Sequence, residues 1–191
     1  MRVKTIQAGA GMTGFTLIEL MLTILVAAVL LSLAIPSYRV QILNSRMAAA
    51  TNDMMGSFHS AKSESVGRSN FITMCKRNAG GTACVNTGGW EQGWLIFADD
   101  DGDGAVDGGE EILYAHGELE AGITARGTAQ VTDRVTYRPN GLTNLTSTQV
   151  IVLCDERGFG ADSRGLVLTV VGKASSLPGP DTAQVTCLVA P

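Results

Sequence analysis

The chain has 191 residues, of which 45% are hydrophobic and 17% are charged, and its formal net charge is -4. This composition excludes an intrinsically disordered chain, and the length suffices for one ordinary domain with one additional element. Loss of Arg2 and Lys4 with an N-terminal leader would leave 12 basic against 18 acidic residues, a net charge of -6. The acidic balance argues against a general nucleic-acid binder.

The apolar residues gather in one segment near the N-terminus, residues 15–35. As a helix these residues would span about 30 Å, the thickness of the hydrocarbon core of a bilayer. Small and polar residues precede the segment at residues 8–11, 13 and 14, whereas a secretory signal peptide has its small residues after the apolar run. Cleavage at that point would leave the segment on the mature protein as an anchor. Arg2 and Lys4 favour a cytoplasmic location for residues 1–14, with the rest of the chain directed across the membrane.

Glu19 lies inside the apolar segment, where a carboxylate costs on the order of 3 kcal/mol unless it finds a partner or reaches the interface. Its partner should be a cation, yet no Lys or Arg occurs between Phe15 and Tyr38. Cleavage after Gly14 would create one cation, the new amino group of Phe15. Because Glu19 is four residues further along the helix, this amine could pair with it within one chain or between neighbouring chains.

Residues 14–20, with the sequence GFTLIEL, and the apolar run that follows resemble the class III signal of type IV pilins and type II secretion pseudopilins. The resemblance implies that a prepilin peptidase cuts between Gly14 and Phe15 and methylates the new amino terminus. It also implies that Glu19 pairs with the Phe15 amino group of the adjoining subunit during assembly. The alternative is a simple signal anchor with an incidental glutamate.

A second helical pattern follows Pro36. Its apolar residues recur at spacings of three and four, which places them on one stripe of an amphipathic helix. They are Val40, Leu43, Met47, Ala50, Met54, Phe58 and Ala61. We therefore expect a leader at residues 1–14, a transmembrane and polymerisation helix at 15–36, and an amphipathic helix at 37–66 that packs on a globular domain.

Residues 67–191 consist of short β-rich runs separated by Gly, Asn and Asp. The clearest expected strands are residues 94–97, 112–114, 134–137, 150–154, 166–171 and 183–189. We predict an α+β, type IV pilin-like fold, in which a mostly antiparallel C-terminal sheet packs on the second half of one long N-terminal helix.

The β-rich region is similar to the GspH/FimT group of minor pilins and pseudopilins, which includes FimU. The resemblance lies at residues 93–97, the acidic turn through Glu110, and residues 137–141, 154–155 and 165–173. It implies a non-enzymatic, low-abundance subunit that helps to start assembly near the tip of a type IV pilus or a type II secretion pseudopilus. It also implies contacts with other minor pilins and with the major pilin or pseudopilins. The chain would cross the bacterial inner membrane once and place its C-terminal domain in the periplasm.

Four cysteines, Cys75, Cys84, Cys154 and Cys187, follow the apolar segment, where a translocated domain would meet an oxidising compartment. We expect two disulfides, each adding about 2 to 4 kcal/mol to stability. Of the three connectivities, we favour Cys75 with Cys84 and Cys154 with Cys187, because the residues between the first pair include two glycines and predict a loop. Four buried thiols are the alternative.

Acidic residues occupy positions 1, 3, 5, 9 and 12 of a twelve-residue calcium-loop pattern, with Gly104 at position 6. They are Asp99, Asp101, Asp103, Asp107 and Glu110. Oxygen ligands at alternate positions, a glycine for the sharp turn and a final carboxylate suit calcium, a hard and flexible cation. The flanking residues predict strands rather than helices, so a solvated acidic turn with no cofactor is the favoured alternative.

No residue pattern predicts catalysis. His59 and His116 are the only histidines, neither lies beside a predicted nucleophile, and no nucleophile-elbow pattern occurs.

DNA receptors among the GspH/FimT group have a basic Gly-Arg-x-Arg motif, and the corresponding stretch here is residues 172–175, Gly-Lys-Ala-Ser. Lys173 is its only basic residue, and phosphate affinity depends on clustered positive charge. We therefore do not expect DNA as a partner unless other basic residues gather on one face. The candidates are Arg126, Arg134, Arg138, Arg157 and Arg164.

Overall fold

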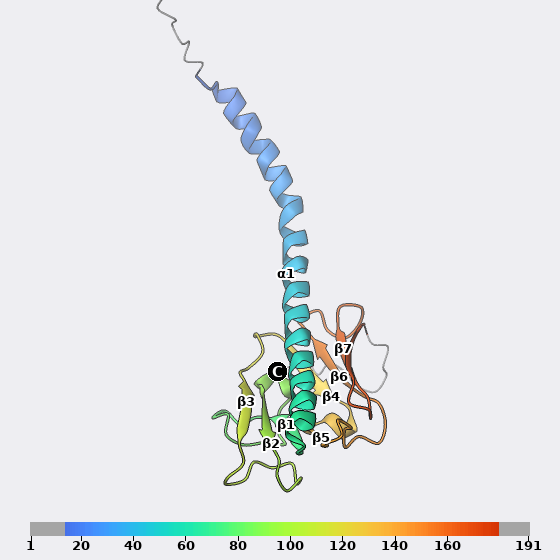
Figure 1. Cartoon of the computed structure of the whole chain (residues 1–191). Coiled ribbons are helices and arrows are strands. Elements are labelled where there is room, and N and C mark those ends of the chain that lie inside the picture. Colours follow the sequence, from blue (N-terminus) through green and yellow to red (C-terminus); the bar gives the residue numbers. More distant parts are fainter. Residues whose placement is uncertain (1–13, 180–191) are drawn as a thin grey trace, which may run out of the picture. The chain divides into compact units, whose positions relative to one another are not determined.

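The computed structural model describes residues 14–179 of the chain. These residues form an α-helix followed by eight β-strands and two short 3-10 helices, η1 (Trp90–Gln92) and η2 (Ala129–Val131). The chain divides into two compact units between Gln41 and Ile42. Helix α1 (Leu17–Arg68) contributes to both units, and Figure 1 shows the strands around its C-terminal region.

The start of α1 is defined by a side-chain cap. The backbone N–H of Glu19 donates to the hydroxyl oxygen of Thr16 at 3.3 Å, so Thr16 satisfies one of the amide groups that the first helical turn leaves unpaired. The helix then continues without a break through Pro36, which removes one backbone donor.

The end of α1 is defined by backbone geometry. Ser69 adopts a left-handed conformation with φ 53°. The N–H groups of Ser69 and Asn70 then donate back to the carbonyls of Val66 and Ser65, respectively. These two bonds satisfy carbonyl groups that the last helical turn leaves free, and they turn the chain toward the first strand.

The first sheet has the antiparallel order β3-β2-β1-β5. Its strands are β1 (Ile72–Lys76), β2 (Trp94–Ala98), β3 (Ile112–His116) and β5 (Arg134–Tyr137). The register pairs Met74 of β1 with Ile96 of β2 and with Val135 of β5. These three side chains therefore lie in one row on the same face of the sheet.

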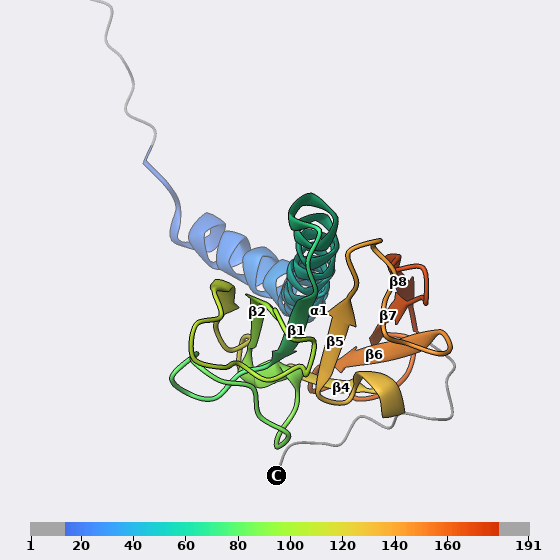
Figure 2. The ribbon, with the colours of Figure 1, turned by 60° about the horizontal axis from the view of Figure 1, so that its bottom comes forward.

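The second sheet has the antiparallel order β4-β6-β7-β8. Its strands are β4 (Thr124–Gly127), β6 (Gln149–Cys154), β7 (Arg164–Leu168) and β8 (Ala174–Pro178). The edge strand β8 ends at Pro178, where the missing backbone donor does not interrupt a central ladder. Figure 2 shows this sheet beside the first one.

One hydrophobic core joins the second half of α1 to both sheets. The helix contributes the predicted stripe from Met47 onward, namely Met47, Ala50, Met54, Phe58 and Ala61. Alternate residues of the strands, such as Ile96 in the first sheet and Leu153 in the second, complete the core. The opposite face of the first sheet carries Leu95 and Phe97, which form a smaller cluster with Cys75.

The predicted α+β fold with one long N-terminal helix and antiparallel strands is confirmed, but the strands form two sheets rather than one. The predicted strands at 94–97, 112–114, 134–137 and 150–154 correspond to β2, β3, β5 and β6. The strand predicted at 166–171 ends at Leu168, because Thr169 begins a turn that Gly172 closes with φ 72°. The strand predicted at 183–189 lies outside the described residues.

Three strands were not predicted. The β1 sequence ITMCK is buried throughout and lacks the alternation that marks a half-exposed strand. The β4 sequence TARG and the β8 sequence ASSLP contain residues of low strand propensity, and their pairing with β6 and β7 holds them in the sheet.

Candidate functional site

The first half of α1 presents an apolar surface without a partner among the described residues. The large apolar side chains between Phe15 and Leu31 are exposed, including Leu17 at 77% and Leu25 at 62%. By length and composition, α1 is the single helix among residues 14–179 that could cross a membrane. A contiguous exposed apolar surface of this kind marks a site of interaction with a membrane or with another protein.

Glu19 is exposed in the first turn of α1, four residues from Phe15. Its backbone is bonded to Thr16, while its carboxylate accepts no hydrogen bond and forms no ion pair within residues 14–179. A carboxylate in the first turn is favoured by the helix dipole. Its side chain remains available to a cation from outside this segment of the chain.

One of the two predicted disulfides lies wholly within the described residues and can be compared with the structure. Cys75 in β1 is bonded to Cys84, with Cα atoms 5.6 Å apart, as the favoured connectivity predicted. Cys154 at the end of β6 is not a free thiol. Its predicted partner, Cys187, lies outside the described residues, so this second pairing stays a prediction.

The acidic loop follows β2 and brings together three of the five predicted metal ligands. One carboxylate oxygen from each of Asp99, Asp101 and Asp103 lies within 4.8 Å of the other two. Asp99 is fully buried, whereas Asp101 and Asp103 are exposed. The loop thus holds a cluster of three carboxylates, of which two face solvent and one is buried.

The other two predicted ligands do not belong to this cluster. Both carboxylate oxygens of Glu110 accept backbone N–H groups, from Asp100 at 2.9 Å and from Asp107 at 2.9 Å. Glu110 therefore closes the two ends of the loop. Asp107 takes part through its backbone, and its side chain is exposed.

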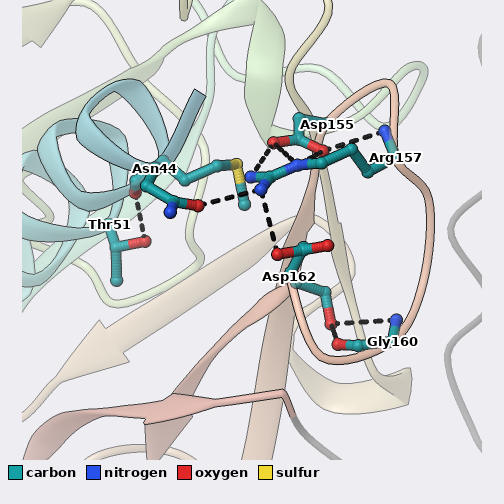
Figure 3. Close-up of polar contacts among 8 residues, drawn as sticks. Asn44, Thr51, Asp155, Arg157, Gly160 and Asp162 are labelled. Carbon is teal, nitrogen blue, oxygen red and sulfur yellow. Dashed lines mark hydrogen bonds and ion pairs between the residues drawn. The ribbon is translucent and has the colours of Figure 1, made fainter. Parts of the chain in front are cut away.

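A network around Arg157 was not predicted from the sequence. Figure 3 shows its guanidinium group between Asp155, Asp162 and Asn44. Arg157 donates to both carboxylate oxygens of Asp155, to Asp162 at 2.9 Å and to the side-chain oxygen of Asn44 at 2.9 Å. The network therefore fastens the β6–β7 loop to α1. Asn44 is far from the other members in the sequence, so no local pattern connects them.

Two ionisable groups of this network depart from their ordinary behaviour. Burial alone would raise the pKa of Asp155, but hydrogen bonds from Arg157 outweigh burial and hold the pKa of this carboxyl below its ordinary value. The hydrogen bond to Asp155 in turn raises the pKa of Arg157. Both groups are therefore charged at neutral pH and form an ion pair.

The basic residues considered for DNA are largely engaged within the domain. Arg126 forms an ion pair with Glu91, Arg157 is held as described, and Arg134 donates to the backbone carbonyls of the acidic loop. Lys173 is exposed in the turn between β7 and β8. Three of the five arginines thus have local partners, which lowers the positive charge available to a phosphate backbone.

The histidines have no catalytic arrangement in the described residues. His116 stacks on Trp94 with ring centroids 4.1 Å apart, and its Nδ1 lies 2.8 Å from the carbonyl oxygen of Gly117. Ser57, which shares a groove with His116, donates its hydroxyl to the backbone carbonyl of Asp53. His59 is exposed on α1. His116 Nε2 also lies 4.0 Å from Oδ2 of Asp53, while the Ser57 hydroxyl is held by the backbone rather than by the imidazole.

Comparison with known proteins gives a consistent result. The family model described as "Type II transport protein GspH" matches residues 50–173. A crystal structure of the type IV minor pilin FimU from Pseudomonas aeruginosa PAO1 in space group P21 has a TM-score of 0.58 and 18% identity, covering 75% of this chain and 96% of FimU. A second FimU crystal form, P65, has a TM-score of 0.53 and 18% identity, covering 73% of this chain and 98% of FimU. No curated protein sequence matches the chain.

The family match extends from the buried region of α1 through the turn between β7 and β8, which is more than half of the chain. Its fold is that of FimU, and family and fold are those of structural pilins rather than enzymes. The chain belongs to the GspH family.

Proposed function

We propose that this chain is a minor pilin, a structural and priming subunit of a type IV pilus tip complex that is needed for pilus assembly. The observation that carries the proposal is the exposed apolar surface of α1 between Phe15 and Leu31, with Glu19 in its first turn. Before assembly, lipid would cover this surface, and in the filament the helices of neighbouring subunits would replace the lipid. Membership of the GspH family and the FimU-like fold support this class of function.

Maturation would create the partner of Glu19. In this proposal a prepilin peptidase cuts between Gly14 and Phe15 and methylates the new amino group. The amine of one subunit then pairs with Glu19 of its neighbour, which neutralises two charges that are costly in apolar surroundings. Within residues 14–179 the carboxylate of Glu19 has no hydrogen-bond or ion-pair partner, and this supports the proposed role.

The proposed location follows from the order of the segments. Residues 1–14 would remain in the cytoplasm, the apolar half of α1 would cross the bacterial inner membrane once, and the β domain would lie in the periplasm before the subunit enters the filament tip. The disulfide between Cys75 and Cys84 supports an oxidising compartment for the domain.

The partners of the assembled subunit would be other minor pilins and the major pilin. Contacts among helices would join the subunits at their N-terminal segments, and the β domain would contact other minor pilins at the tip. Helix packing and the pairing of Glu19 require no cofactor. A calcium ion, if the acidic loop binds one, would act on the β domain rather than on polymerisation.

A minor pseudopilin of a type II secretion system is the second candidate. The description of the matching family as a type II transport protein favours it, and the same helix and Glu19 would serve in a pseudopilus. We do not propose DNA reception, because Arg126, Arg134 and Arg157 already have partners within the domain.

A clean deletion of the gene tests the class of machine. Loss of surface pili and twitching supports the pilus subunit, whereas loss of exoprotein release with pili intact supports the pseudopilin. Loss of DNA uptake with normal pili would support the DNA receptor instead. A deletion strain that is normal in all these assays contradicts the proposal.

The complemented deletion strain also tests the role of Glu19. We expect Glu19→Gln to remain in the membrane and to be absent from sheared filaments. Thr23→Ala is the matched control, because within residues 14–179 the Thr23 hydroxyl bonds only to the carbonyl of Leu20 in its own helix. Normal incorporation of Glu19→Gln would refute the proposed pairing. Mass spectrometry of the mature chain should find methylated Phe15 at the amino terminus, and retention of residues 1–14 would overturn the maturation step.

A further inference from the structure

We propose that Asp99, Asp101 and Asp103 form a calcium site in the loop between β2 and β3, which stabilises the β domain. The three side chains alternate along the loop, and their carboxylate oxygens converge within 4.8 Å of one another. This inference does not depend on the proposed assembly role, because the loop lies in the second compact unit and away from Glu19 in sequence.

The buried carboxylate of Asp99 has the properties of a cation ligand. Asp99 is 0% exposed at the end of β2. Its Oδ2 accepts hydrogen bonds from the Thr73 hydroxyl at 2.6 Å and from the backbone N–H of Gly104 at 3.1 Å. Its Oδ1 is buried as well and has no hydrogen-bond partner among the described residues. A buried, unsatisfied carboxylate oxygen is strongly unfavourable, and a bound cation would satisfy it.

No basic side chain of the described residues supplies that charge. The ion pairs of residues 14–179 include none with Asp99, Asp101 or Asp103. The Arg134 guanidinium group contacts the loop elsewhere, since it donates to the backbone carbonyls of Asp103 at 3.4 Å and Gly104 at 2.6 Å. Arg134 therefore supports the backbone of the loop without pairing with these carboxylates.

The burial of Asp99 favours calcium over magnesium. Direct ligation by a fully buried carboxylate requires the ion to give up water on that side. Calcium takes six to eight oxygen ligands in flexible geometry, whereas magnesium demands a near-ideal octahedron and dehydrates reluctantly. Asp101 and Asp103 are exposed, so water can complete the six to eight ligands that calcium takes.

The scaffold of the site couples it to the first sheet. Thr73 of β1 orients Asp99 and is itself 2.7 Å from the hydroxyl of Thr136 in β5. Glu110 closes the loop by accepting the backbone N–H groups of Asp100 and Asp107. Calcium bound at Asp99 would therefore hold together β1, β2 and the loop, and it would favour the folded domain over the unfolded one.

Calorimetric titration of the full chain in detergent micelles with calcium chloride, at constant ionic strength, tests the site. We expect one calcium ion per chain with a Kd on the order of 10⁻⁴ to 10⁻³ M, the range of extracellular calcium modules. Calcium should also raise the thermal unfolding midpoint of the β domain. Magnesium chloride at the same concentrations should give neither effect. The absence of calcium heat at millimolar concentration, or an equal response to magnesium, would overturn the proposal.

Two substitutions locate the ion within the loop. Asp101→Asn removes one exposed carboxylate of the cluster and should weaken calcium affinity roughly tenfold or more. Asp107→Asn removes an exposed carboxylate of the same loop outside the cluster, and calcium affinity should be retained. Unfolding midpoints measured without calcium establish that both variants fold. Equal calcium affinity of the two variants would show a diffuse acidic surface and refute the assignment.

Discussion

The two halves of α1 have opposite relations to the rest of the protein. In the first half, Leu25 and its apolar neighbours are exposed, with Leu25 at 62%. In the second half, Phe58 is fully buried in the core that α1 shares with both sheets. The first half is apolar on all sides and the second has one apolar stripe, so the pattern around the helix distinguishes a surface that needs external partners from one that the domain covers.

Truncation of one large apolar side chain in each half of α1 tests this contrast, and the change in the free energy of unfolding should differ most here. Phe58→Ala should lower the free energy of unfolding of the β domain by about 3 to 5 kcal/mol, because it leaves a cavity beside Trp90, whose ring centroid is 6.2 Å from that of Phe58. Leu25→Ala should change this free energy by less than about 0.5 kcal/mol. Denaturant unfolding followed by tryptophan fluorescence, with the full chain in detergent, measures both. A large effect of Leu25→Ala would contradict the contrast between the two halves of α1.

The next effect concerns the covalent support of the β domain. Replacement of both Cys75 and Cys84 by Ala should lower the free energy of unfolding by about 2 to 4 kcal/mol, because the unfolded chain regains the freedom that the disulfide removes. The same unfolding assay measures the change, and amide exchange in the first turn of α1 should not alter. An unchanged unfolding midpoint would show that the disulfide has no stabilising role.

A smaller, pH-dependent effect is expected at the Arg157 network. Asp155→Asn should lower the free energy of unfolding at neutral pH by about 1.5 to 3 kcal/mol, through loss of charged hydrogen bonds. Because the pKa of Asp155 is lowered on folding, the contribution of this carboxylate is complete above its ordinary value of 3.8 and disappears as the pH falls through the lower, folded value.

Unfolding midpoints of the wild type and Asp155→Asn, measured from neutral pH to below 3.8, should therefore converge at the acidic end. Asp162→Asn is the matched control, because its side chain is 50% exposed while it pairs with the same guanidinium group. It should change the free energy of unfolding by less than about 1 kcal/mol. A constant difference between wild type and Asp155→Asn at every pH would contradict the assigned ion pair.

The smallest effect is expected at the start of α1. Thr16→Ala removes the cap on the N–H of Glu19 and should destabilise the first turn by about 1 kcal/mol, with roughly fivefold faster amide exchange there. Thr23→Ala, in which the hydroxyl lost was bonded to Leu20 of the same helix, should leave that exchange rate unchanged. Unaltered amide exchange in Thr16→Ala would show that the Thr16 side chain does not cap α1.

Local sequence patterns predicted most of the fold. The stripe that includes Met54 and Phe58 predicted the buried face of α1, because a helix repeats every 3.6 residues. The strands missed were those whose burial or pairing, rather than composition, holds them in place. The β4 sequence TARG shows this. It is held in the sheet by pairing with β6, a separate segment further along the chain that begins at Gln149.

The candidate sites were predicted less completely, because they depend on contacts between distant segments. The acidic pattern identified all five carboxylates, but it could not reveal that Glu110 bonds to backbone N–H groups instead of joining the cluster. Nothing in local sequence connects Asn44 with Arg157, which are 113 residues apart. Such pairings require the three-dimensional arrangement of helix and loop.

The fastening of the β6–β7 loop to α1 has a mechanical consequence for a subunit in a filament under tension. Asn44 lies close to the point where the second compact unit begins, and its side-chain oxygen accepts a hydrogen bond from Arg157. Force transmitted along α1 into the second compact unit would therefore pass in part through this contact. The ion pairs of Arg157 with Asp155 and Asp162 would then distribute the pull over the loop between β6 and β7.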